Sequence, residues 1–222
     1  VAHGYDAIVA AAELFALRAL HPAGFSFQNP EALLDAYRSE LYRFDQLYRQ
    51  FQFKAAGANR EGWNLLKDLT VRVEDLYDQG FLQPLGIEWS RLLDDGFLSV
   101  WRASNMASQQ DFYEQVLEPH LQQSERKRAY VIISDAFRYE AARELVDALN
   151  GRFGVGAEID AMLGVLPSYT PLGRASLLPH TELAYADDGA VLVDGRPVNG
   201  TAGRDQHLAG VGGMACQAAE LI

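Results

Sequence analysis

The stretch from residue 126 to residue 180 constrains the fold most, because each of its two apolar runs ends at polar residues and leads into a helical pattern. The first run, Ala129–Ile133, is rich in β-branched residues and predicts a strand buried on both faces. It ends at Ser134 and Asp135. Apolar residues three and four positions apart then predict a helix as far as Asn150. A strand followed by a helix in this way is typical of an α/β sheet.

The second apolar run, Ala157–Leu166, predicts another strand and leads to a Thr-Pro pair. Thr170 at the N-cap and Pro171 after it favour a helix start, so we expect a short helix over Leu172–Leu178. If the two strands are parallel neighbours, Asp135 and Thr170 face the same crevice, where ligands of open α/β sheets collect.

The residue types at these two positions suit phosphoryl transfer. The Asp135 carboxylate is a ligand for zinc or for hard divalent cations. The Thr170 hydroxyl lies where a phosphate is favoured, and a metal could lower its pKa enough to make it a nucleophile. Each residue can equally serve only as the N-cap of its helix, and the residues alone leave both interpretations open.

A family resemblance favours the catalytic interpretation. The segments VIISDAFRYEAARELVDAL and AMLGVLPSYTPLGRASLLPH resemble the opening of a PglZ domain, a family of BREX phage-defence systems in the alkaline phosphatase superfamily. The resemblance continues weakly through VLVDGRPVNG and AYRSELYRFDQLYRQF, and so covers most of the chain. It implies that Asp135 binds metal, that Thr170 binds metal and attacks phosphorus, and that the metals are two divalent ions. Zinc is the first choice, with magnesium or manganese as alternatives.

The sequence departs from the superfamily pattern in its later metal ligands. An Asp-His dipeptide is typical there, and this chain has none. The candidates after Thr170 follow no obvious buried strand; they are His180, Asp187, Asp188, Asp194, Asp205 and His207. We therefore expect the chain to be a fragment of a longer protein, with an active site that is incomplete within it.

The first half of the sequence predicts a helical domain. Asn29 and Pro30 are a strong helix start, and the helix is expected to run to about Ala56. Its apolar residues alternate three and four apart: Leu34, Tyr37, Leu41, Phe44, Tyr48 and Phe51. This stripe predicts the core seam of a local helical bundle, and the alternative is a docking face for a partner helix.

The expected architecture combines these two parts. A helical domain over 1–125 precedes residues 126–222, which by resemblance are the N-terminal part of an alkaline phosphatase-like (PglZ) domain. The fold class is thus a helical bundle followed by the start of an α/β/α sandwich with a mainly parallel sheet. Within the second part, Asp194-Gly195 between two short apolar segments predicts a β-hairpin.

Composition excludes several classes of protein. A net charge of −11 argues against a broad nucleic-acid clamp, although it allows a metal site that meets one phosphodiester at a time. No apolar run approaches the roughly 18 residues that span a membrane, so no membrane partner is expected. The single cysteine, Cys216, excludes an internal disulfide and fits a reducing compartment such as the cytoplasm.

Two functions remain. The first is a metal-dependent phosphohydrolase or phosphodiesterase of phage defence, with Thr170 as nucleophile and Asp135 as metal ligand. The second is a non-catalytic structural or assembly module of a multi-protein defence complex. The resemblance implies other BREX proteins as partners and a nucleic acid as the possible substrate.

Overall fold

The computed structural model describes residues 2–60, 66–123 and 128–220. Its contacts group into two compact units, and we describe each by itself. The helical unit comprises Val1–Trp101 and Phe137–Asp160, and the mixed unit comprises Arg102–Ala136 and Ala161–Ile222. The division into domains at residues 125 and 126 concerns the whole protein and stays a prediction.

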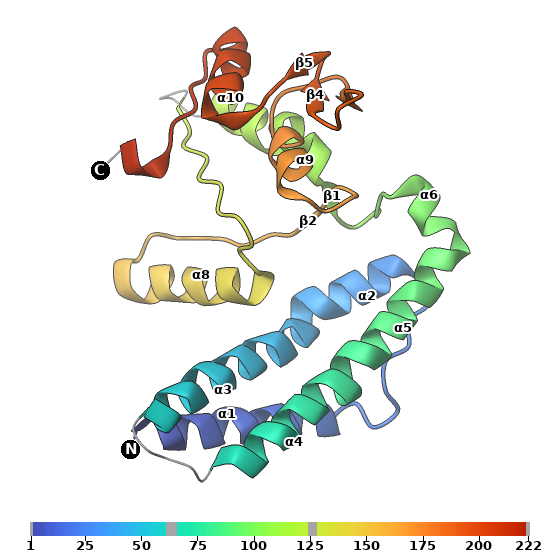
Figure 1. Cartoon of the computed structure of the whole chain (residues 1–222), viewed down its shortest axis with the longest axis vertical. Coiled ribbons are helices and arrows are strands. Elements are labelled where there is room, and N and C mark those ends of the chain that lie inside the picture. Colours follow the sequence, from blue (N-terminus) through green and yellow to red (C-terminus); the bar gives the residue numbers. More distant parts are fainter. Residues whose placement is uncertain (1, 61–65, 124–127, 221–222) are drawn as a thin grey trace. The chain divides into compact units, whose positions relative to one another are not determined.

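The helical unit is built from seven described helices, several of them joined without a break in helical backbone (Figure 1). They are α1 (Ala2–Ala19), α2 (Pro30–Ala36), α3 (Tyr42–Arg60), α4 (Lys67–Tyr77), α5 (Gln83–Leu92), α6 (Leu98–Val100) and α8 (Tyr139–Phe153). Short π-helical turns connect α2 to α3 and α4 to α5, whereas the connection from α5 to α6 is kinked at Gly96, whose φ is 98°. The chain therefore stays helical through Gly80 and Pro84, where turn-forming residues suggest interruptions.

The expected helix start and core seam are both present. The side chain of Asn29 accepts a hydrogen bond from the backbone N–H of Ala32 at 2.8 Å, and Pro30 begins α2. From the apolar stripe, Leu41, Phe44 and Phe51 are buried in the core of the helical unit. Phe44 stacks on Phe81 with ring centroids 4.3 Å apart. The interpretation of the stripe as a bundle seam is confirmed.

A polar network crosses this apolar core. The buried Asp45 carboxylate accepts hydrogen bonds from Tyr37 Oη at 2.5 Å, from Arg138 Nη2 at 2.9 Å, and from the hydroxyl of Tyr77. Arg138 also pairs with the fully buried Glu140 at 3.3 Å. Burial, and then the hydrogen bond to Asp45, raises the pKa of both tyrosines, so each remains a neutral donor. The network fixes the first turn of α8 against α3 and α4.

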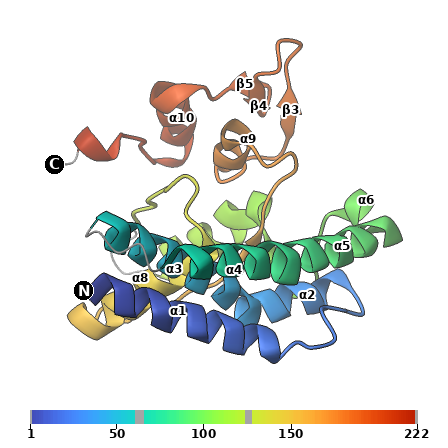
Figure 2. The ribbon, with the colours of Figure 1, turned by 60° about the horizontal axis from the view of Figure 1, so that its bottom comes forward.

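The mixed unit contains short strands and helices (Figure 2). They are β1 (Ala107–Ser108), α7 (Glu118–Gln123), β2 (Met162–Leu163), α9 (Thr170–Ala175), β3 (Leu183–Tyr185), β4 (Val191–Val193), β5 (Arg196–Pro197) and α10 (Gly200–Leu208). β1 and β2 pair in parallel, whereas β3, β4 and β5 form an antiparallel sheet.

The predicted hairpin is confirmed. β4 and β5 flank Asp194 and Gly195, which have φ angles of 48° and 74°. Positive φ at both central residues matches a type I′ turn, whose twist suits a hairpin. Val191 and Val193 point into a small apolar core that they share with Leu172 and Ala175 of α9. This core holds α9 against the antiparallel sheet.

The predicted strand over Ala129–Ile133 is wrong for this chain. Residues 128–134 contain no strand, and Tyr130 and Ile132 are 80% and 88% exposed. Of the second run, only Met162–Leu163 is in a strand, and its neighbour is β1 rather than the first run. A parallel strand is stable when it is paired and covered on both faces, and the described residues supply neither for this run.

No helix in the described part of the chain combines the length and the apolar character needed to cross a bilayer.

Candidate functional site

Asp135 lies in a turn rather than at a helix start. Ala136, the next residue, has a positive φ of 53°, and Arg138 is the N-cap of α8. The interpretation of Asp135 as a helix cap is therefore wrong. Its carboxylate is about half exposed and pairs with Arg174, whose Nε lies 3.3 Å from Oδ1 and whose Nη2 contacts Oδ2. Both carboxylate oxygens thus face one guanidinium.

Thr170 is the first residue of α9 rather than its N-cap, so the helix begins earlier than expected. Tyr169 is the N-cap, and no side chain caps this helix. The expected N-cap role of Thr170 is therefore wrong, and the helix ends at Ala175 rather than Leu178. The Thr170 side chain is exposed, and its hydroxyl has no hydrogen-bond partner among the described residues. Because the Thr170 hydroxyl does not cap its helix, it remains accessible as a hydrogen-bonding or nucleophilic group.

The mixed unit brings Asp135 to the helix that Thr170 begins. Arg174, the partner of Asp135, is four residues after Thr170 in α9 and therefore lies on the same face, about one turn or 5.4 Å further along. Asp135 therefore contacts the last turn of the helix whose first residue is Thr170. The roles of Asp135 as metal ligand and of Thr170 as nucleophile stay predictions.

A second arginine, Arg204, lies in the same unit. Arg204 lies in α10, one turn before Leu208, and Leu208 packs against the core cluster that contains Leu172 of α9. Burial lowers the pKa of Arg204, the positive charge of Arg174 lowers it further, and the Asp135 carboxylate opposes the shift. No sequence pattern singles out Arg174 or Arg204, because each is polar and lies outside the capping and turn motifs.

Gln109 holds α9 in place, and no sequence pattern singled it out. Its Oε1 accepts a hydrogen bond from the N–H of Val165 at 3.2 Å, and its Nε2 donates to the carbonyl of Gly173 at 2.8 Å. One side chain therefore ties the segment after β2 to the helix that carries Thr170 and Arg174.

The remaining candidate ligands serve the local fold. His180 Nδ1 and His207 Nε2 lie 2.6 and 2.7 Å from the carbonyl oxygens of Leu178 and Pro179. Asp194 accepts three hydrogen bonds at the hairpin, of which that from the Thr181 hydroxyl does most to lower its pKa.

The side chains present do not complete a metal centre. Over the residues that the structure describes, no three His, Cys, Asp or Glu side chains group in a way that could hold a metal ion. Asp135 fits as a single carboxylate ligand, but its present partner is an arginine. A metal at this position would need further ligands from outside the described part of the chain.

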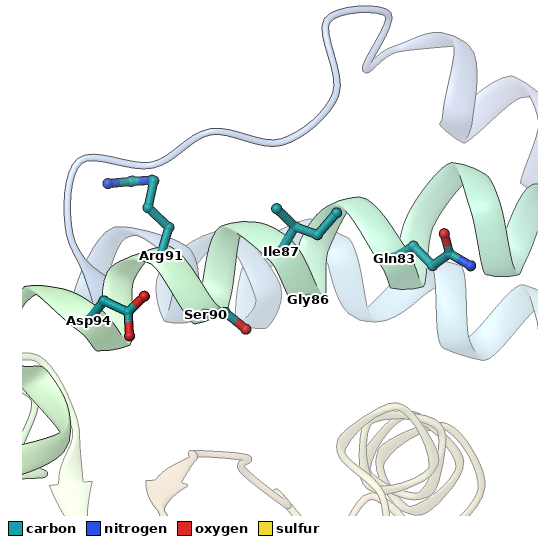
Figure 3. A pocket seen from close by; sticks show the side chains of 6 residues that line it. All are labelled: Gln83, Gly86, Ile87, Ser90, Arg91 and Asp94. Carbon is teal, nitrogen blue, oxygen red and sulfur yellow. The ribbon is translucent and has the colours of Figure 1, made fainter.

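A surface hollow elsewhere is unrelated to this pair. It runs along α5 in the helical unit, where it is lined by Gln83, Gly86, Ile87, Ser90, Arg91 and Asp94 (Figure 3). Its arginine already pairs with Glu88 at 2.8 Å and donates to the carbonyl of Phe27. The hollow is an open helix face and contains no cluster of catalytic groups.

Comparison with known proteins identifies the family. Residues 112–222 match the family model described as the BREX system PglZ alkaline phosphatase-like domain. The chain is 38% identical over 221 residues to the alkaline phosphatase-like protein BrxZ of Escherichia coli O9:H4 (strain HS), covering 98% of this chain and 26% of that protein. It is 34% identical over 203 residues to the alkaline phosphatase-like protein PglZ of Bacillus cereus (strain H3081.97), covering 90% of this chain and 23% of that protein.

The chain thus spans about a quarter of the length of these relatives. No solved structure matches it significantly. The match over half of the chain establishes that it belongs to the family of BREX system PglZ alkaline phosphatase-like domains.

Proposed function

We propose that the protein containing this chain is a metal-dependent phosphohydrolase or phosphodiesterase that acts in phage defence. Thr170 is the nucleophile and Asp135 is a metal ligand. The observation that carries the proposal is the pairing of the Asp135 carboxylate with the helix that begins at Thr170, whose hydroxyl is free of capping. The two residues are 35 positions apart in the sequence, so the contact of Asp135 with this helix comes from the fold of the mixed unit.

The proposed reaction has two steps. The Thr170 Oγ forms a bond to phosphorus as the bond to the leaving oxygen breaks, and the leaving group takes up a proton. Water then cleaves the phosphothreonine ester and restores the hydroxyl. Divalent ions, with zinc first and magnesium or manganese as alternatives, would supply charge neutralisation and a lower hydroxyl pKa. The further ligands and the rest of an α/β/α sandwich come from the remainder of the protein.

The cellular setting is also a proposal. Membership of a BREX family supports a role beside other BREX proteins, with the cytoplasm as the compartment and a nucleic acid as the possible substrate. The acidic charge of the chain, −11, favours contact with one phosphate at a time over a broad electrostatic surface.

Hydrolysis of p-nitrophenyl phosphodiesters by the full-length protein tests the nucleophile. We expect Thr170→Ala to reduce turnover by about 10³-fold or more, since loss of a nucleophile removes the covalent route. Thr170→Ser keeps a hydroxyl and should retain measurable turnover. Ser168→Ala, an exposed hydroxyl two positions earlier, is the matched control and should behave like the wild type. Unchanged turnover in Thr170→Ala would remove the assignment.

The metal content of the same proteins tests Asp135 separately. Asp135→Ala should retain less divalent metal than the wild type after exhaustive dialysis, because a ligand is lost. Equal metal content in the two proteins would remove Asp135 from the ligand set, whatever the outcome for Thr170.

One observation favours the second function, a non-catalytic assembly module. The described residues contain no group of three metal-binding side chains. If the full-length protein binds no metal and hydrolyses no phosphodiester, the assembly function is the one that remains for this protein. Co-purification with other BREX proteins would then be kept in Asp135→Ala and in Thr170→Ala.

A further inference from the structure

Two tyrosine rings stack beside the first residue of α9. Tyr169 is the N-cap of this helix and immediately precedes Thr170, and Tyr185 is the last residue of β3. The planes of the two rings are 18° from parallel, and their centroids are 6.5 Å apart. This separation is near the upper end of the range for offset stacking, so the rings cover only part of each other's faces.

The small apolar core of the mixed unit brings these two rings together. Leu172 of α9 and Val191 of β4 are buried in this core, and Tyr169 packs against it. β3 pairs with β4 in antiparallel register, with Tyr185 opposite Val191. The packing that holds α9 against the antiparallel sheet therefore also fixes the stacked pair (Figure 2).

The tyrosine pair presents an aromatic surface to solvent. Tyr185 is 50% exposed, and among the described residues it lies outside the apolar cluster that forms the core of this unit. A large aromatic ring stabilises a fold mainly through the area it buries, and half of this ring remains in water. Thr170, the residue after Tyr169, is exposed as well. An accessible aromatic surface thus adjoins an accessible hydroxyl.

The chemistry of this surface suits a nucleobase. Bases stack on aromatic side chains whatever their sequence, because every base has a π-face. Stacking requires no positive charge on the protein, which matters for a chain with a net charge of −11. In a nucleotide a single sugar separates the base from the phosphate. A base on the tyrosine pair and a phosphate at the next residue, Thr170, can therefore belong to one nucleotide.

We propose that Tyr169 and Tyr185 form a stacking platform for the base of a nucleotide whose phosphate is attacked by Thr170. The platform favours nucleotidyl phosphodiesters over phosphoesters that lack a base. The identity of the phosphate rests on the proposed hydrolase function, which this inference deepens by naming its substrate class. Binding of the base, in contrast, can be measured without turnover.

Binding of AMP and of ribose 5-phosphate to the full-length protein, measured by calorimetry, tests the platform. The two ligands share a sugar and a phosphate, and only AMP has a base. We expect the wild type to bind AMP about tenfold more tightly or better, since stacking of one base is worth roughly this factor. Tyr185→Leu keeps apolar bulk and removes the aromatic face, so it should abolish this preference and leave the binding of ribose 5-phosphate unchanged.

Two further variants separate stacking from a structural role. Tyr185→Phe keeps the ring and should bind AMP like the wild type. Tyr5→Leu is the matched control, because Tyr5 is a tyrosine of α1 that is 63% exposed, and the substitution should leave the binding of both ligands unchanged. If Tyr185 served only to hold α9 in place, Tyr185→Leu would weaken the binding of both ligands alike.

The platform also makes a kinetic prediction. Thymidine 5′-(p-nitrophenyl phosphate) and methyl p-nitrophenyl phosphate have the same leaving group, and only the first has a base. We expect Tyr185→Leu to raise KM for the thymidine ester by about tenfold with little change in kcat, the result of losing binding that is equal in the ground state and the transition state. Both constants for the methyl ester should stay as in the wild type.

The outcomes distinguish the platform from the proposed function. The inference is overturned if the wild type binds AMP no better than ribose 5-phosphate, if Tyr185→Leu weakens both ligands alike, or if Tyr5→Leu has the same effect as Tyr185→Leu. If AMP binding depends on Tyr185 while Thr170→Ala keeps full turnover, the platform stands and the nucleophile assignment fails. If Thr170→Ala loses turnover while the base makes no difference, the nucleophile stands and the platform fails.

Discussion

At the scale of single residues, Asp45 is the buried carboxylate on which the polar network of the helical unit depends. Its carboxylate is buried, and it accepts hydrogen bonds from two tyrosine hydroxyls and from Arg138. Such a network is stable only when each member keeps its partners. The core of the helical unit is therefore specified by polar contacts as well as by apolar packing.

We expect Asp45→Ala to lower the free energy of unfolding of this chain by about 3–5 kcal/mol, since it leaves two buried hydroxyls without their acceptor and removes one of the two carboxylates that pair with Arg138. Urea denaturation measures the change. Asp6→Ala is the control, because the Asp6–Lys54 pair is exposed and its loss should cost under about 1 kcal/mol. Similar costs for the two variants would contradict the structural importance given to the buried network.

Glu88 gives a residue-scale prediction about pH. Hydrogen bonds from Arg91 and from the backbone N–H of Phe27 lower the pKa of Glu88 from 4.5 to about 2. Because the folded pKa is the lower one, the contribution to stability is complete above pH 4.5 and is lost as pH falls toward 2. In Glu88→Gln, the free energy of unfolding should therefore fall by less between pH 5 and pH 3 than it does in the wild type. An unchanged slope would remove Glu88 from the acid response.

At the scale of elements, local signals predicted those parts that local chemistry determines. Asn29 and Pro30 predicted the start of α2, and Asp194-Gly195 predicted the β4–β5 hairpin, because a cap and a turn need only neighbouring residues. The strand over Ala129–Ile133 was not found, because a strand depends on partners far along the chain. The caps were also wrong at Asp135 and Thr170, where the structure instead has a turn and the first helical residue.

The surroundings of Asp135 were less predictable than the residue itself. Asp135 was predicted as a site residue because it follows an apolar run, and Thr170 because it precedes a proline. Arg174 follows no periodic or capping pattern, and only the fold of the mixed unit places it beside Asp135. Charge partners that lie far apart along the chain cannot be read from sequence spacing.

The apolar run supports a prediction at this scale. We expect Tyr130–Ile133 to become a paired, buried strand in the full-length protein, which is about four times longer in its relatives. Backbone amides of this run should exchange hydrogen slowly in the full-length protein and quickly in the 222-residue chain. Fast exchange in both would show that the run has another role.

A pair of substitutions gives an independent check of the same strand. Ile132→Lys should change the stability of the 222-residue chain by less than about 0.5 kcal/mol, because Ile132 is 88% exposed there. In the full-length protein it should lower the melting temperature clearly, since a buried charge would lack a partner. Ile87→Lys, at an exposed isoleucine of α5, is the control and should be mild in both proteins.

At the scale of the whole molecule, the chain contains the two residues of the proposed catalytic centre and a helical unit. It spans about a quarter of its relatives, so the proposed chemistry belongs to the full-length protein. The proposed contribution of this chain is the Asp135 carboxylate and the Thr170 hydroxyl. In the proposal, the other metal ligands come from outside the described residues.

The covalent intermediate on Thr170 is the most direct test of this account. The full-length protein should be mixed with a phosphodiester substrate, quenched in acid during turnover, digested, and analysed by mass spectrometry. We predict a phosphoester on the peptide that contains Thr170, absent in Thr170→Ala and shifted to the serine in Thr170→Ser. Steady hydrolysis by the wild type without any label at Thr170, together with unchanged turnover of Thr170→Ala, would contradict it.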